Sequence, residues 1–247
     1  MTTHHRPPSR AARARRPGRH RGITLVEFAI VMPLATLFVL SLIQIGMVYM
    51  ARLTLNHATF MAARVGSVHN ADPEIIRTAL LRGLSPFYQD STDSSDVTRL
   101  LKAWALTKLD NVPIKPYAAK VEILSPSADT FTDFGVKDPK TKVTYIPNDN
   151  LEWRTLGVGA KSKQNIRDAN LLKLKVTYGY ELKVPVIAGV LQRMMCGGTI
   201  GPQAYGNVKP WEALFGPVSQ ECLRYYQWGR VPLESFAIVE MQSRAEK

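Results

Sequence analysis

The sequence predicts an α+β protein in which a long amino-terminal helix precedes a domain of short helices and an antiparallel sheet. The first observation is the stretch from Phe28 to Ala51, 24 residues without a charged side chain. The second is a change of period, because helical spacing of apolar residues gives way to strand-like alternation after about residue 120. Helices followed by strands are typical of α+β domains.

The first 22 residues contain seven arginines and no acidic residue. Their Pro-, Arg- and Ala-rich composition predicts a disordered basic leader, residues 1–22. Removing these seven charges from the net charge of +12 leaves about +5 for the remaining 225 residues. The high pI therefore requires no nucleic-acid partner.

The apolar stretch is long enough to cross a membrane. As a helix it measures about 36 Å, against about 30 Å for a bilayer's hydrocarbon core. It is too long for the apolar core of a secretory signal peptide. The basic flank places the amino terminus in the cytoplasm and the carboxyl-terminal domain outside. We divide the chain into a leader, a transmembrane helix (23–51), a helical stalk (52–70) and a globular domain (71–247).

The stalk carries small residues at a spacing of four, namely Ala58, Ala62 and Gly66. Such a ridge permits close approach of a second helix backbone. The pattern favours packing of the stalk on its own domain, and the alternative is a contact between subunits that aids assembly.

The globular domain begins with two predicted helices. Asp72-Pro73 is typical of a helix start, and a second helix is expected near Ser95 with apolar residues on one side. Strands are then predicted at 120–123, at 172–180, where alternation is strict, and at 235–240. Two long segments, 125–170 and 186–231, are expected to be loops.

The sequence Gly22–Phe28, placed directly after a basic leader, resembles a class III or type IV prepilin cleavage site. Its continuation to Pro33, followed by Ala51-Arg52 and Ala62–Arg64, is similar to the TadE-like pseudopilins of the tight-adherence (Flp, type IVc) pilus system. The close resemblance covers about residues 22–66.

The resemblance implies a role for each motif residue. A prepilin peptidase would cut between Gly22 and Ile23, because glycine lets the protease approach the bond closely. Glu27 would pair with the cationic amino terminus of an adjacent subunit; the alternatives are that it reaches the membrane interface or pairs with Arg21. Pro33 removes one helix hydrogen bond and would soften the helix, or would simply kink it.

The function that the resemblance implies is structural, that of a minor pilin that helps to assemble or initiate a tight-adherence pilus. Its expected partners are the bacterial inner membrane, a prepilin peptidase, other minor pilins, the major pilin and the inner-membrane assembly platform. Two alternatives remain open: a pseudopilin of a type II secretion apparatus, and an inner-membrane-anchored periplasmic domain that binds or hydrolyses a ligand.

No residue pattern predicts an enzyme. None of the five histidines has a zinc-site spacing, and we expect no catalytic residue, metal or cofactor. Cys196 and Cys222 are predicted to form a disulfide, because two cysteines in an exported domain usually pair. The alternative is a pair of reduced, buried thiols.

Overall fold

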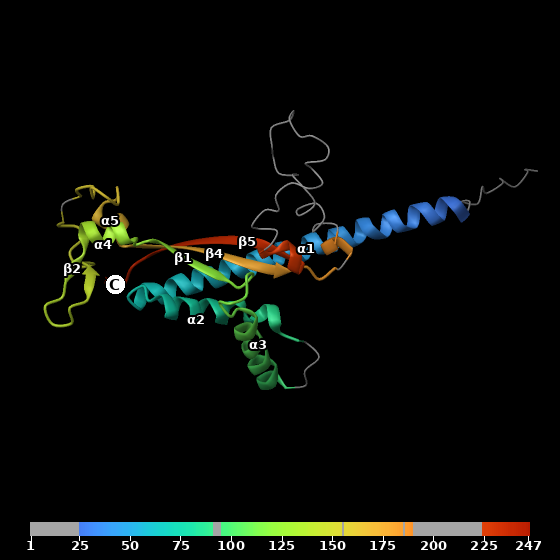
Figure 1. The fold of residues 1–247 in the computed structure, drawn as a ribbon, viewed down its shortest axis with the longest axis horizontal. Helices are drawn as coiled ribbons and strands as arrows, with labels where there is room; N and C mark the ends of the chain where they lie inside the picture. Colours follow the sequence, from blue (N-terminus) through green and yellow to red (C-terminus); the bar gives the residue numbers. More distant parts are fainter. Residues whose placement is uncertain (1–24, 91–94, 155, 185, 190–223) are drawn as a thin grey trace, which may run out of the picture. The chain divides into compact units, whose positions relative to one another are not determined.

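The computed structural model describes residues 25–90, 95–154, 156–184, 186–189 and 224–247 (Figure 1). The chain divides into two compact units, Met1–Phe38 and Val39–Lys247. The α1 helix, Leu25–Val68, contributes residues to both of them. The leader, the predicted cleavage site Gly22-Ile23, and both cysteines lie outside the described residues.

The α1 helix is 44 residues long and has Pro33 in its interior. Three threonines in it donate side-chain hydrogen bonds to the carbonyl four residues earlier; for example, Thr59 Oγ1 lies 2.8 Å from the Leu55 carbonyl oxygen. Beyond its end, the backbone N–H of Ala71 donates to the Gly66 carbonyl at 3.0 Å, and Asn70 and Ala71 both have positive φ. This turn directs the chain into α2.

The two predicted short helices are present. The α2 helix, Pro73–Leu84, starts as the sequence indicated: Asp72 Oδ1 accepts a hydrogen bond from the Glu74 N–H at 2.8 Å. The 3₁₀ helix η1 (Ser85–Tyr88) follows, and α3 spans Asp96–Asp110. The apolar side of α3 is largely exposed, with Val97 and Leu101 at 67% and 64%; its buried residues are Ala103 and Thr107.

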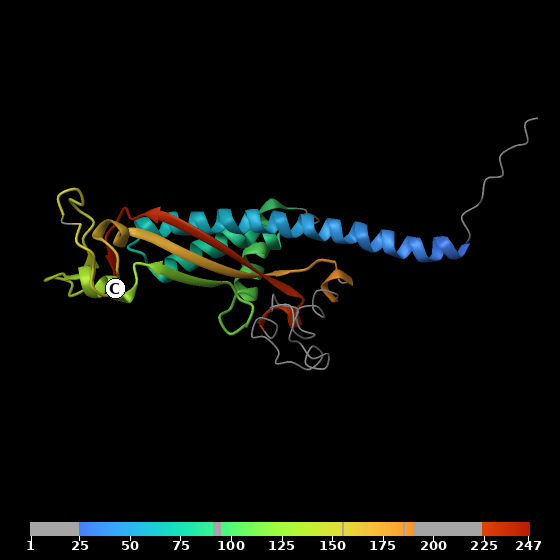
Figure 2. The ribbon, with the colours of Figure 1, turned by 90° about the horizontal axis from the view of Figure 1, so that it is seen from above.

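The main sheet has the order β1-β4-β5, with both pairings antiparallel. Its strands are β1 (Lys120–Ser125), β4 (Leu171–Glu181) and β5 (Arg230–Glu240). The alternation predicted for β4 is confirmed, since Leu172, Leu174 and Val176 are buried. Figure 2 shows α1 and α2 running along this sheet.

A second, small sheet has the order β2-β3-β6 and also contains only antiparallel pairs. Its strands are β2 (Val136–Lys137), β3 (Thr144–Ile146) and β6 (Ala245–Glu246). The remaining elements are α4 (Ala128–Phe134), α5 (Ile166–Ala169) and the 3₁₀ helix η2 (Tyr226–Trp228). The segment 125–170, predicted as one long loop, therefore holds two short helices and two short strands.

One hydrophobic core joins α1, α2 and the main sheet. Within α1, its members begin at Ala51 and include Leu55, which is 0% exposed. Core residues lie on both sides of residue 71, where we placed the start of the globular domain.

The small-residue ridge lies inside this core. Ala58 and Ala62 are both 0% exposed, and a Cβ on Gly66 would come within 2.6 Å of Ile76. Likewise, a Cβ on Gly83 of α2 would lie 2.6 Å from the Ala58 Cβ. The ridge is thus packed within the chain, which is the arrangement that the small-residue pattern favoured.

Candidate functional site

The first part of α1 is apolar and exposed, which is unusual for a helix of a folded domain. Phe28, Leu34 and Phe38 expose 56%, 64% and 65% of their surface. Within Glu27–Val68, an 18-residue stretch has a mean hydropathy of 2.3, and only 6% of it is buried. The core helix of a soluble protein would be mostly buried, so this helix fits a single-pass membrane anchor.

The motif residues in this stretch sit at defined places on the helix. Glu27 is exposed and lies in the first turn of α1, where the helix dipole favours a carboxylate. Pro33 lies two turns farther on and leaves the Ala29 carbonyl without its usual helical donor, yet the helix continues through it. Gly22 and Ile23 lie outside the described residues, so their geometry relative to Glu27 stays a prediction.

Gln44 is a residue whose role the sequence did not reveal. It lies within the uncharged stretch but is only 2% exposed, and its Oε1 accepts a hydrogen bond from the Val184 N–H at 2.9 Å. Within the described part of the chain its Nε2 has no hydrogen-bond partner. A lone amide within an otherwise apolar stretch was the available signal, because such a group needs a partner when it is desolvated.

A cluster of polar side chains joins η1 and α3 to the main sheet. Tyr88 Oη donates to Asp110 Oδ2 at 2.6 Å, and it lies 3.1 Å from Tyr178 Oη, which must therefore be the donor in that pair. The Arg230 guanidinium also binds Asp110 Oδ2, at 2.9 Å. Lys115 Nζ lies 3.2 Å from Asp110 Oδ1, so both oxygens of this carboxylate are engaged.

The protonation states within this cluster follow from its surroundings. Burial, followed by the neighbouring Tyr178 and Asp110, raises the pKa of Tyr88 above its ordinary value, and burial raises the pKa of Tyr178 to about 12. Burial alone would raise the pKa of Asp110, but the hydrogen bond from Tyr88 and the charges of Arg230 and Lys115 lower it overall. Both phenols stay protonated and the carboxylate charged, so the cluster acts as a structural tie.

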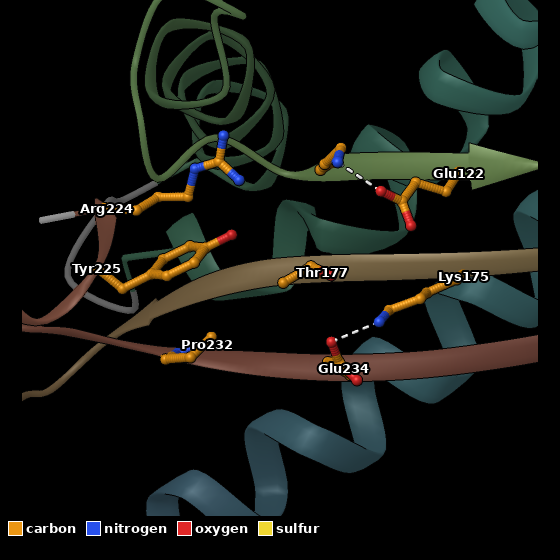
Figure 3. A pocket seen from close by; sticks show the side chains of 8 residues that line it. Glu122, Lys175, Thr177, Arg224, Tyr225, Pro232 and Glu234 are labelled. Atoms are coloured by element: carbon orange, nitrogen blue, oxygen red, sulfur yellow. Dashed lines mark ion pairs between the residues drawn. The ribbon is translucent and has the colours of Figure 1, made fainter. Parts of the chain in front are cut away.

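The outer face of the main sheet carries a cavity of about 570 Å³, shown in Figure 3. Lys175 Nζ pairs with Glu234 Oε1 at 2.7 Å across β4 and β5, and Lys120 pairs with Glu122 on β1. These charges neutralise one another on an open, solvated surface. Among the described residues, the arrangement is that of a polar sheet face with cross-strand ion pairs.

No group of three or more His, Cys, Asp or Glu side chains among the described residues is placed to hold a metal ion. His57 and His69, the two histidines that the structure describes, are both exposed on α1 or the turn after it. The exposed apolar half of α1 therefore remains the best candidate for the functional site.

The model of the TadE-like protein family matches residues 22–64 of this chain. The matched region begins at the predicted cleavage site, contains Glu27 and Pro33, and ends within the part of α1 that packs into the core. The resemblance predicted for residues 22–66 is thereby confirmed. No curated protein and no solved structure matches the chain.

Proposed function

We propose, with the TadE-like character of residues 22–64 as the premise, that this chain is a minor pilin of a tight-adherence pilus. The observation that carries the proposal is the position of the family match, which contains the whole exposed apolar part of α1. A surface of this kind has to be covered, either by lipid or by neighbouring helices. A pilin uses both environments in turn, lipid before assembly and protein afterwards.

Processing is the first step of the proposed function. A prepilin peptidase hydrolyses the Gly22–Ile23 bond and leaves a mature chain of 225 residues with a new amino group on Ile23. Glu27 then becomes the fifth residue. Its carboxylate pairs with the amino group of an adjacent subunit, which compensates a charge that costs about 2.5–3 kcal/mol at mid-bilayer and less near the surface.

The remaining parts of the proposal follow from topology. The basic leader keeps the amino terminus in the cytoplasm, and the part of the chain beyond the apolar stretch faces the periplasm. Its partners there are other minor pilins and the major pilin, while the assembly platform acts on the membrane segment. In this role the protein initiates or assists assembly and catalyses no reaction.

Intact mass of the membrane-extracted protein tests the processing step. We expect the mature mass in cells with an active prepilin peptidase, and the full mass when the peptidase is absent. Gly22→Val should block cleavage by filling the approach to the bond, whereas Gly18→Val, a matched change in the leader, should not. A protein that begins at Met1 in the presence of active peptidase would refute the proposal.

Assembly is tested separately with Glu27→Gln, which removes the charge and keeps the shape of the side chain. Because the pairing is lost but the helix stays apolar, the variant should be cleaved and inserted normally and should build fewer pili. The measurement is the number of pili per cell together with the amount of mature protein in the membrane. Normal piliation by this variant would show that Glu27 has no pairing role.

A further inference from the structure

The segment after β4 is attached to α1 at a point inside the apolar stretch. The Val184 N–H donates to Gln44 Oε1, and the same face of α1 is covered farther along at Ala51 and Leu55, which are 3% and 0% exposed. Residues 44, 51 and 55 share one face because their spacings of seven and four approximate whole helical turns. The domain therefore begins to cover α1 at Gln44.

The opposite face of α1 is apolar and uncovered over the same range. Leu42, Tyr49 and Leu53 expose 53%, 62% and 47% of their surface. Arg52, on the flank of this face, is also exposed. Tyr49 thus lies near the end of the apolar stretch, and tyrosine is enriched where a membrane helix reaches the headgroups.

Counting along the helix gives the depth of Gln44. About 20 residues of helix cross the ~30 Å hydrocarbon core, so a span that starts at Phe28 ends near Met47. Gln44 then lies within one turn of the outer hydrocarbon boundary, and Tyr49 and Arg52 lie among the headgroups. An amide at that depth is stable only when protein shields it, which the Val184 hydrogen bond does.

The same bond brings the following residues to the bilayer surface. Residues 186–189 are helical, and the Ala188 N–H donates to the Val184 carbonyl at 3.0 Å. Val186 in this turn exposes 50% of its surface. Lys183, whose side chain is 52% exposed, supplies a cation beside this turn, although it also pairs with Glu181 at 3.0 Å.

We infer that the described residues of the segment 182–189, together with the uncovered face of α1 around Tyr49, form a lipid-contact surface that holds the domain against the outer boundary of the bilayer. The inference rests on the proposed membrane anchorage of α1. Its occupant is phospholipid, because the uncovered apolar residues around Tyr49 lie on the same helix as the exposed residues of the proposed span. The domain then lies directly on the membrane and has no spacer between them.

Depth-dependent quenching of tryptophan fluorescence tests this surface. The full chain is reconstituted into phospholipid vesicles whose acyl chains are brominated either near the headgroup or near the methyl end. The variant Val186→Trp is compared with Phe38→Trp, near the middle of the proposed span, and with Val158→Trp, an equally apolar position 69% exposed in the loop before α5. The native tryptophans give the same background in each.

We expect lipid brominated near the headgroup, the shallow quencher, to reduce the added fluorescence of Val186→Trp more than lipid brominated near the methyl end, the deep quencher. For Phe38→Trp we expect the deep quencher to have the larger effect. Val158→Trp should lose no fluorescence, because α5 and residue 182 lie at opposite ends of the 11-residue strand β4. Quenching at Phe38→Trp without quenching at Val186→Trp overturns the lipid-contact surface and leaves the anchor intact. No quenching at Phe38→Trp overturns the anchor itself, and equal quenching at Val186→Trp and Val158→Trp shows unspecific adsorption and refutes the surface.

The variants are also compared for urea midpoint, since a misfolded chain would expose any tryptophan. Gly189→Trp provides a second position in the same turn, where an added Cβ meets no described atom within 4 Å. It should reproduce the shallow quenching of Val186→Trp. Failure at both positions in folded protein refutes the lipid-contact surface.

Discussion

Replacing Leu55 with alanine should destabilise the folded domain, whereas the same change at Leu53 should not. Both leucines lie on α1, only two residues apart, but Leu55 is 0% exposed in the core and Leu53 is 47% exposed on the opposite face. The two variants thus compare the same leucine-to-alanine substitution at a buried position and at an exposed one. It tests directly whether this part of α1 belongs to the domain or is a separate stalk.

The size of the effect follows from burial. Truncating a fully buried leucine costs about 2.7–5 kcal/mol. This cost is the sum of the hydrophobic transfer free energy of the removed carbons and the free energy of the cavity that they leave. Against a total of about 5–15 kcal/mol, this is a large fraction of the stability of the unit. An exposed leucine in a helix contributes far less, and Leu53→Ala should change the free energy of unfolding by within about 0.5 kcal/mol.

The assay is urea unfolding of the detergent-solubilised protein, followed by tryptophan fluorescence; Trp104 is packed against the core and provides a reporter. For a unit of this size, about 3 kcal/mol corresponds to a fall of roughly 6–12 °C in Tm, which gives a second measurement. Equal stabilities for Leu55→Ala and Leu53→Ala would refute the shared core and restore an independent domain that starts near residue 71.

Three further outcomes are expected. Because the folded-state pKa of Asp110 is lowered, its contribution to stability is present above its unfolded pKa of about 3.9 and is lost as pH falls through the folded value. Asp110→Asn should cost about 2 kcal/mol at pH 7, by leaving the arginine that it pairs with uncompensated, and should flatten the acid limb of the stability profile; an unchanged acid limb would contradict the assignment. Gly83→Ala should cost about 1–3 kcal/mol by forcing α2 away from α1, while Gly46→Ala, where a Cβ meets nothing within 4 Å, should stabilise the helix by up to about 1 kcal/mol, and calorimetry distinguishes the two. Alkylation with mass analysis before and after reduction should find Cys196 and Cys222 joined in the exported protein, and two free thiols there would exclude the bond.

Elements with a local signal were predictable from the sequence. The cap and proline at Asp72-Pro73 mark the start of α2, and the strict alternation after Leu171 marks β4. Each signal arises because the residues that satisfy the backbone or the core are neighbours in the chain. The antiparallel main sheet followed from the same alternation in β5, whose Leu233, Ser235 and Ala237 are buried.

Contacts between distant segments had no such signal. The Gln242 and Ser243 N–H groups both donate to the Ser67 carbonyl at 2.9 Å, which ties the carboxyl-terminal segment to the end of α1. The small sheet pairs Tyr145 with Glu246, about 100 residues apart. No local periodicity encodes such pairings, so the segment 125–170 was predicted as a loop.

Burial was the other quantity that the sequence could not supply. The apolar side of α3 is indistinguishable from a core face by its spacing, yet Leu101 is 64% exposed there. Conversely, Gln44 looks from the sequence like a polar residue that a membrane helix tolerates, yet it is buried against the rest of the chain. Which face of a helix is covered depends on the sheet laid against it, and that is a tertiary property.

The division of α1 into two environments separates stability from function along a single helix. Among the described residues, the buried core members of α1 all lie at Ala51 or beyond, while the stretch from Phe28 to Val39 is exposed and apolar. Exchanging lipid for neighbouring helices around the exposed stretch replaces one apolar environment with another, so its hydrophobic cost is small. The core needs no rearrangement in that exchange. Under the proposed function, substitutions in residues 28–39 should therefore alter assembly with little effect on the unfolding of the domain, and substitutions on the buried face of residues 51–67 should do the reverse.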